Sequence, residues 1–522
     1  MRSNSIGRGN GVLRWAPSAL LLVLCAAPLA ALVVVGSQRS QGGLLLHLGR
    51  TVLPMQAGYS FATAIGAVAL GAALAAGGGL CGLFDFPGRR VLQRALVVPL
   101  LIPPWFYALI YQDRYGISGL GTLVLVLAIS SAPLFQLFLT ASIVDIPSKH
   151  FDMLRVLGRG APAHLVRHVL PLGVPALAAA AVLAFLLAWG DGASARILAV
   201  PTLTVGMYDQ WFGRQQDAAG ASFAVALVVA SLVPTVTVWA LVARKSWAPV
   251  GRLQRGSAPR VRLSGLASSV PWLMGTPLLI SGVVLPGVTI AQWCIERIDR
   301  VDLVAVGEDT VRTLLLALGG TLIAVALAIV LLRDRITERA RRLGSITEHV
   351  VLATFAIPGL VLALAFLWLL PEDADSVVFS AVNSTPAPLC VAMGMRFCAV
   401  ALFAGEAALL RTTRGHADVL RVHGRTSLAS FVQLFRPFMM RPLMAGACFV
   451  LLECMKDLSL SLVLQPFGFT TIAIRMFQYS QTQRIHDCAV WIVCLILIGA
   501  YPLSVLARLA DAERGNTIQY SR

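Results

Sequence analysis

Charged residues are scarce in this chain. Only 13% of its 522 residues are Asp, Glu, Lys or Arg, whereas 57% are hydrophobic and the mean hydropathy is +0.78. About a quarter of the residues of a typical soluble domain are charged, so this composition excludes an ordinary soluble protein. The apolar residues form long blocks, and about 20 such residues span a bilayer as a helix that satisfies its own backbone. The sequence therefore predicts an all-α integral membrane protein.

Lysine is rarer still, and several catalytic motifs do not occur. The three lysines are Lys149, Lys245 and Lys456, and the sequence contains no G-x-x-x-x-G-K-[ST] loop for nucleotide phosphates. It also contains no H-E-x-x-H motif and no nucleophile elbow. The nine cysteines include no C-x-x-C pair, and the histidines fall mostly in loops. We therefore predict a non-enzymatic chain with no catalytic residues, no metal site and no cofactor of its own.

Twelve apolar blocks are long enough to cross a membrane. The predicted spans lie near residues 17–37, 59–83, 93–112, 118–144, 172–198, 220–243, 271–293, 311–332, 349–370, 387–410, 442–464 and 486–508. The short blocks around Pro103 and Pro358 carry internal prolines, which membrane helices tolerate when neighbours satisfy the backbone.

The net charge of +17 is concentrated on one side of these spans. Arginines cluster before the first span and after the second, sixth and eighth spans, and the loop at residues 371–383 on the opposite side is acidic. Cytoplasmic loops of membrane proteins carry such an excess of basic residues. We therefore predict that both termini are cytoplasmic, and the basic residues give no reason to expect nucleic-acid binding.

An internal repeat divides the chain. Asp152-Met-Leu-Arg-Val-Leu-Gly-Arg159 recurs, 266 residues later, as Asp418-Val-Leu-Arg-Val-His-Gly-Arg425. A proline follows each glycine, Pro171 after Gly158 and Pro437 after Gly424. Repeats with an even number of spans keep the same orientation, as in parallel-repeat transporters. The sequence predicts a first six-span repeat at residues 1–243, a basic cytoplasmic linker at 244–269 and a second six-span repeat at 270–522.

Each copy of the repeat predicts a cytoplasmic helical hairpin, at residues 147–171 and 413–437. Gly158 and Gly424 suit the end of a first helix, and a second short helix is expected to end at Pro171 or Pro437. Short helices with a few apolar residues suit docking into a partner's groove. An amphipathic loop lying on lipid headgroups is the alternative, although it does not explain the repeated acid, glycine and proline spacing.

These hairpins resemble the EAA loop of binding-protein-dependent ABC importer permeases. That loop has an acidic residue, two small residues, a glycine and, further on, a leucine and a proline. Here the acid is aspartate, Met153-Leu154 and Val419-Leu420 replace the small residues, and Arg436 precedes the second proline. Glu406-Ala407-Ala408 spells the motif but lacks the glycine and lies within a predicted span. The resemblance implies ATPase-coupling residues at Asp152, Leu154, Gly158, Pro171, Asp418, Leu420, Gly424 and Pro437.

The resemblance extends to fused twelve-span permeases of the iron(III) type. Similar stretches occur at Ala356–Gly359, Pro201–Thr204 and Gln465–Thr471. It implies the type I importer fold, a bacterial inner-membrane location and alternating access. The implied partners are a cytoplasmic ABC ATPase dimer, which would bind ATP and Mg, and a periplasmic or lipid-anchored solute-binding protein. Iron(III) is the expected cargo, with thiamine, phosphonates or polyamines as alternatives. An ion-gradient-driven secondary transporter is the rival of another class, whereas a membrane-embedded enzyme is disfavoured by the missing motifs.

Several ionisable residues fall inside predicted spans, where charge is costly and usually functional. Glu453, Lys456 and Asp457 are spaced to share one helical face, so Lys456 can pair with either acid. The repeat offset matches Asp457 to Asp191. These four residues are candidates for the translocation pathway, and a buried ion-pair cluster that fixes helix packing is the alternative. Arg396 and Glu406 in the tenth span are expected to form structural pairs.

Overall fold

The computed structural model describes 42–144, 162–213, 219–231, 261–337, 341–369, 384–411 and 439–515, with 153, 156 and scattered positions between 19 and 34. The chain forms two compact units. Unit 1 comprises Met1–Leu45, Gln210–Thr235 and Val311–Thr471, and unit 2 comprises Leu46–Asp209, Val236–Thr310 and Ile472–Arg522. Each unit therefore combines the middle of one predicted repeat with the two ends of the other. The division of the chain into two six-span sequence repeats stays a prediction.

Apart from two strands of two residues each, the regular elements of the described chain are helices. The first predicted repeat contains α2 (Gly42–Thr51), α3 (Leu53–Leu74), α4 (Ala76–Leu83), β1 (Phe84–Asp85), α5 (Arg89–Ala95), the 3-10 helix η1 (Val98–Leu101), α6 (Pro104–Tyr115), α7 (Leu120–Val144), α9 (Pro162–Trp189), α10 (Ala193–Ile197), α11 (Leu203–Tyr208) and the π-helix η2 (Asp209–Gly213). A further apolar helix covers Ala219–Ser231.

The remaining elements follow residue 260. They are β2 (Val261–Arg262), η3 (Gly265–Ser269), α13 (Val270–Leu279), the π-helix η4 (Ile280–Val284), α14 (Leu285–Arg297), η5 (Ile298–Arg300), α15 (Leu303–Thr337), α16 (Arg341–Ala356), α17 (Gly359–Leu369), α19 (Ala387–Arg411), α22 (Met440–Lys456), α23 (Ser459–Leu464), α24 (Ile472–Gln481), η7 (Ile485–Cys488) and α25 (Ala489–Gly515).

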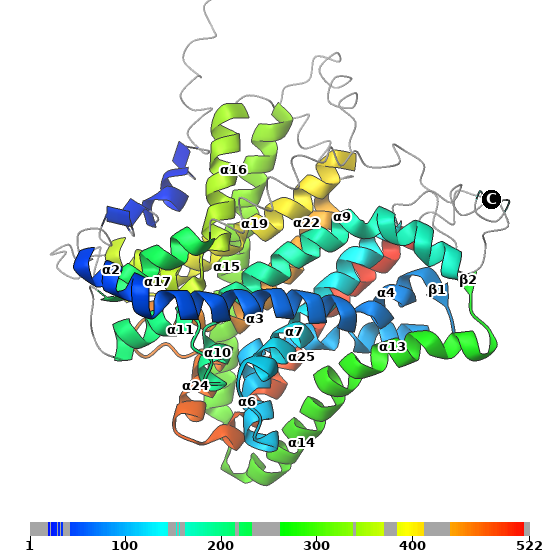
Figure 1. Cartoon of the computed structure of the whole chain (residues 1–522), viewed down its shortest axis with the longest axis horizontal. Helices are drawn as coiled ribbons and strands as arrows, with labels where there is room; N and C mark the ends of the chain where they lie inside the picture. Colours follow the sequence, from blue (N-terminus) through cyan, green and yellow to red (C-terminus); the bar gives the residue numbers. More distant parts are fainter. Residues whose placement is uncertain are drawn as a thin grey trace, which may run out of the picture. The chain divides into compact units, whose positions relative to one another are not determined.

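The core of unit 2 is a set of packed helices, α3, α7 and α9, with α4 against both α7 and α13. These helices are marked in Figure 1, where α13 and α14 form one long helix that bends along its course. A Cβ on Gly77 of α4 would collide with the backbone of Gly275 in α13. Small residues at such crossings let membrane helices approach closely. The strands β1 and β2 add a short parallel pair, Phe84 with Val261 and Asp85 with Arg262.

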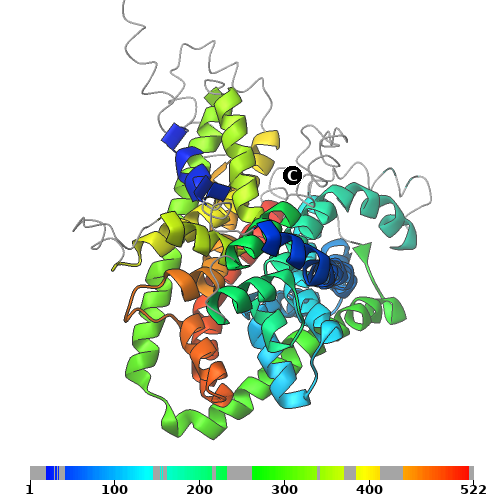
Figure 2. The same ribbon diagram turned by 60° about the vertical axis from the view of Figure 1, so that its left-hand side comes forward.

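Unit 1 is built around α19, which packs against α16 and α22, while α17 packs against α23. Figure 2 gives a second view of these yellow-green to orange elements. The helix α17 is apolar on all sides, and Val361, Ala363 and Leu364 are fully buried. A helix without a polar face is expected to lie inside a bundle or in lipid.

Seven helices of the described chain are long and apolar enough to cross a membrane, and two bent pairs would raise the number to nine. The predicted spans at 93–112 and 349–370 are not single straight helices. They are bent by 92° between η1 and α6 and by 113° between α16 and α17. The predicted span at 442–464 is also interrupted, because α22 ends at Lys456. Parts of the predicted spans at 17–37 and 220–243 lie outside the described residues.

Candidate functional site

The second coupling hairpin lies outside the described residues, and of the first hairpin the structure describes 162–171 with residues 153 and 156. Of their eight predicted coupling residues, only Pro171 is described. The second short helix of the first hairpin was expected to end there, and this expectation is wrong, because α9 continues through Pro171 and Pro175 to Trp189. A proline inside a helix removes one backbone hydrogen bond, and here Pro171 and Arg167 are both exposed.

Both bent pairs turn at the same dipeptide, isoleucine–proline. In unit 2, Ile102 is extended and α6 begins directly after Pro103, whose carbonyl accepts from the amides of Phe106 and Tyr107. In unit 1, the carbonyl of Pro358 accepts from the amides of Val361 and Leu362 in the same way. A residue before proline is biased away from helical geometry, which explains a break at each site.

Asp191 lies at a second break in unit 2, between α9 and α10. Its Oδ1 accepts from the backbone N–H of Ser194 at 2.8 Å, and its Oδ2 accepts from the Ser194 hydroxyl at 2.8 Å. Asp191 therefore caps α10 by satisfying a backbone N–H of its first turn. The short helix α10 then packs against α6. We refer to these two elements as the α6–α10 pair.

Asp457 occupies the equivalent place in unit 1, between α22 and α23. Its Oδ1 accepts from the backbone N–H of Leu460 at 2.8 Å, so it too caps the next helix. The helix α23 packs against α17, the arm that follows the Pro358 bend. This α17–α23 pair repeats the arrangement of the α6–α10 pair. The match between Asp191 and Asp457 expected from the repeat offset therefore extends to their local structure.

A buried ion pair distinguishes the α17–α23 pair. The Arg396 guanidinium donates to Asp457 Oδ2 at 2.8 Å, and the two side chains are 9% and 6% exposed. A Cβ on Gly359, the first residue of α17, would collide with this guanidinium. Arg396 thus lies where the two broken helices meet. It was expected to form a structural pair, and its partner is Asp457, one of the pathway candidates.

The other two pathway candidates pair with each other. Lys456 Nζ lies 2.8 Å from Glu453 Oε1, and both side chains are about one tenth exposed, at 10% and 11%. Of the two acids offered to Lys456 by helical spacing, the structure therefore brings Glu453 into contact, while Asp457 lies past the end of α22 in extended geometry. That these charges line the pathway stays a prediction, and a role in fixing helix packing stays its alternative.

Two tyrosines on α6 that were not singled out from the sequence hold the bend of α13–α14. In the π-helix η4 the Leu285 amide bonds to Ile280, which leaves the Ser281 carbonyl without its usual donor. Pro286 has no N–H for the Gly282 carbonyl. The Tyr107 hydroxyl donates to Gly282 O at 2.7 Å and the Tyr111 hydroxyl to Ser281 O at 2.9 Å. The pairs lie 170 or more residues apart, so no local sequence signal could have identified them.

A buried carboxylate in unit 2 was also missed. Asp309 is fully buried and accepts from Arg475 Nε at 2.8 Å and from Trp491 Nε1 at 3.1 Å. The hydrogen bond that Arg475 donates to Asp309 raises the pKa of the Arg475 guanidinium above its ordinary value. Asp309 stands near the start of an apolar helix, and this position is a signal that a search for intramembrane charges could have used.

Metal-binding groups do not gather in the part of the chain that the structure describes. No set of three or more His, Cys, Asp or Glu side chains there is arranged to hold an ion. All nine cysteines lie among the described residues and are free thiols, five of them buried.

One known protein family matches the second part of the chain. Residues 320–512 match the binding-protein-dependent transport system inner membrane component. This stretch supports an ABC importer permease. The matched region contains α17, α19, α22 and α23, and therefore the whole α17–α23 pair with Arg396. No curated protein and no solved structure matches the chain.

The family assigns the matched region a transport role rather than a catalytic one. Together with the apolar helices, it supports a multi-pass protein of the inner membrane. The family as a whole works with an ABC ATPase and a solute-binding protein. The match begins within α15 and ends within α25, so residues 1–319 lie outside it.

Proposed function

We propose that this chain is the membrane-spanning permease of an ABC importer in which both sequence repeats contribute to one solute pathway. The observation that carries the proposal is the family match at residues 320–512, which includes the second predicted hairpin, 413–437. The first hairpin repeats its acid, glycine and proline spacing. Each hairpin is proposed to dock into one subunit of a cytoplasmic ATPase dimer.

The proposed mechanism is alternating access. Closure of the ATPase dimer on ATP draws the two docked hairpins together and favours the outward-open state, and hydrolysis releases it. Coupling of this kind is a free-energy link between nucleotide and solute sites, so solute binding must also influence nucleotide binding. The α6–α10 and α17–α23 pairs are proposed to line or gate the pathway through Asp191, Glu453, Lys456 and Asp457, because helix breaks are common at transporter binding sites.

The hairpin proposal is tested by a double substitution, Gly158→Asp with Gly424→Asp. An added side chain is poorly tolerated where a helix ends in left-handed geometry, so docking and ATP-driven uptake should be lost while the chain still inserts into the membrane. Gly213→Asp, in a position with open space around it, is the matched control and should transport normally. Normal uptake by the double variant would refute the docking role.

We propose iron(III) as the cargo, by resemblance to the fused permeases of that type, with thiamine, phosphonate and polyamines as the alternatives. In such systems the binding protein determines much of the specificity. Isolation of the binding protein that associates with this chain, and measurement of the solute it retains, would decide among these cargoes. A binding protein that retains thiamine and not iron would overturn the iron assignment.

A further inference from the structure

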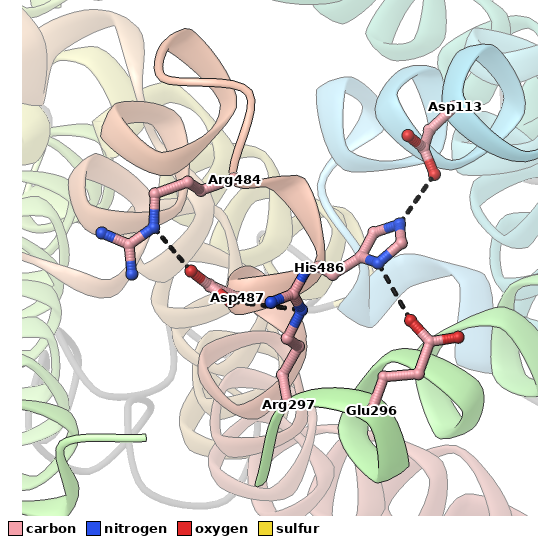
Figure 3. Close-up of polar contacts among 6 residues, drawn as sticks. All are labelled: Asp113, Glu296, Arg297, Arg484, His486 and Asp487. Carbon is pink, nitrogen blue, oxygen red and sulfur yellow. Dashed lines mark hydrogen bonds and ion pairs between the residues drawn. The ribbon is translucent and has the colours of Figure 1, made fainter. Parts of the chain in front are cut away.

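A histidine joins three separate segments of unit 2. The Nδ1 of His486 lies 3.0 Å from Glu296 Oε2 at the end of α14, and its Nε2 lies 3.3 Å from Asp113 Oδ2 near the end of α6. The imidazole also stacks on Trp293 with a centroid distance of 5.1 Å. Figure 3 shows the ring between the two carboxylates, one on each side.

The geometry calls for the doubly protonated ring. A neutral imidazole has one N–H donor and one bare nitrogen, whereas the imidazolium has two donors. A bare nitrogen facing a carboxylate oxygen brings two lone pairs together, so one of the two contacts is lost when the ring is neutral. Only the imidazolium binds Asp113 and Glu296 at once.

The charges around the ring favour the same state. The neighbouring Asp487 is held by Arg484 at 2.7 Å and by Arg297 at 3.7 Å. The carboxylates of Asp113, Glu296 and Asp487 carry three negative charges, and the two guanidiniums carry two positive ones. A charged His486 therefore makes the cluster neutral, whereas an uncharged His486 leaves one excess negative charge. On the remaining packed helix, α24, Tyr479 lies under Arg484, and burial raises the pKa of Tyr479. The Cys488 thiol donates to the Met476 carbonyl.

The ring is open to the solution that would control its charge. His486 is 33% exposed, Asp113 28% and Glu296 54%. In the predicted topology the three segments follow the third, seventh and eleventh spans, which places them together on the non-cytoplasmic side. Histidine is the side chain whose charge ordinarily changes between about pH 5 and 8.

We propose that His486 is a proton-controlled latch that ties the end of α6 to α14 and to the start of α25 when the outer compartment is acidic. The helix α6 is the arm that follows the 92° bend. Tyr107 and Tyr111 attach its middle to η4, and the latch attaches its end. As the pH rises and the imidazolium loses a proton, one bridge opens and the end of α6 gains freedom.

Hydrogen exchange on the full-length chain in lipid nanodiscs tests the latch. The measured quantity is the protection of amides at the end of α6, after correction for the chemical effect of pH on exchange. In the unmodified chain protection should be about three- to tenfold higher at about pH 5.5 than at about pH 8. His486→Gln should abolish this difference, and His47→Gln, at an exposed histidine of α2 in the same unit, should retain it.

A pH response that persists in His486→Gln, or no response in the unmodified chain, overturns the latch. If His486→Gln yields a chain without protected amides, Glu296→Gln replaces it, since that side chain is more than half exposed. A reduced pH response in Glu296→Gln supports the latch, and an unchanged one refutes it. None of these results depends on the identity of the ATPase or the cargo.

Discussion

The α6–α10 pair of unit 2 and the α17–α23 pair of unit 1 share one backbone arrangement, but different interactions hold them in place. We call these interactions the anchors of the two pairs. Each has an isoleucine–proline bend, a short helix capped by an aspartate, and packing between the two. In the α17–α23 pair the capping Asp457 is bound by the buried Arg396 guanidinium. In the α6–α10 pair the capping Asp191 is bound by the Ser194 hydroxyl, and α6 is attached instead through Tyr107 and Tyr111.

A backbone arrangement that occurs twice therefore does not require the same charged residues in both places. The repeat offset places Ser130 where Arg396 stands in the second repeat. The α17–α23 pair is therefore held by an ion pair from α19, which carries Arg396, whereas the α6–α10 pair is held to α13–α14 by neutral hydrogen bonds. Substitutions should consequently cost much more at the charged anchor than at the neutral one.

Arg396→Leu should give the largest effect. It leaves the Asp457 carboxylate buried without its cation, and removal of one partner of a buried pair costs about 3–5 kcal/mol. The free energy of unfolding in mixed detergent and denaturant would measure this loss. Arg396→Leu combined with Asp457→Leu should recover part of the stability, because no charge then remains buried. A loss under about 1 kcal/mol for the single variant would contradict the anchor.

Tyr107→Phe should have the next largest effect. It leaves the buried Gly282 carbonyl without a donor, and an unsatisfied buried acceptor costs about 1–3 kcal/mol. The same unfolding measurement applies, with Tyr115→Phe as the control because Tyr115 is 43% exposed. Equal stability of the Tyr107→Phe and Tyr115→Phe chains would show that the hydrogen bond to the Gly282 carbonyl does not hold α6 in place.

Gly359→Ala should act through Arg396. The added methyl group displaces the guanidinium from its place beside α17, and overpacking of this kind costs about 1–3 kcal/mol. In the Arg396→Leu background the same substitution should cost much less, so a double-mutant cycle would reveal the coupling. Additive losses in that cycle would contradict the contact. Pro104→Ala, at the corresponding position of the α6–α10 pair, serves as a control that cannot disturb the ion pair.

Ser194→Ala should have the smallest effect. It removes one hydroxyl bond to Asp191 but leaves the backbone cap, and a single hydrogen bond contributes about 0.5–1.5 kcal/mol. Asp191→Ala removes both bonds and should cost more than Ser194→Ala in the same unfolding measurement. If Ser194→Ala cost as much as Arg396→Leu, the proposed contrast between the two anchors would fail.

Hydropathy predicted that the apolar blocks are helices, but it did not predict where these helices break. Pro103 and Pro358 were expected to be tolerated within continuous spans, whereas the helix pairs at these prolines are bent by 92° and 113°. Asp191 and Asp457 were placed inside spans because averaged hydropathy hides a helix that ends and restarts within a few residues. Their role as caps depends on backbone geometry that local composition does not encode.

The partners of charged and polar groups were the least predictable part of the candidate site. Helical spacing offered Lys456 two acids, and tertiary packing brings Glu453 to Lys456 and Arg396 to Asp457. Tyr107 reaches a carbonyl 175 residues away because Pro286 and the π-helix expose it. Such contacts arise only when distant segments meet. The coupling residues at 152–158 and 418–437 stay predictions from the repeat and the resemblance.

Uptake into proteoliposomes tests whether this chain is the permease of an ATP-driven importer. The purified chain, with the ATPase and binding protein that accompany it, would be reconstituted with ATP on the ATPase side and, separately, with an ion gradient and no ATP. We predict uptake that requires hydrolysable ATP and the separate ATPase, and that persists when ion gradients are dissipated. Uptake by the chain alone, driven by an ion gradient without ATP, would contradict it and identify a secondary transporter.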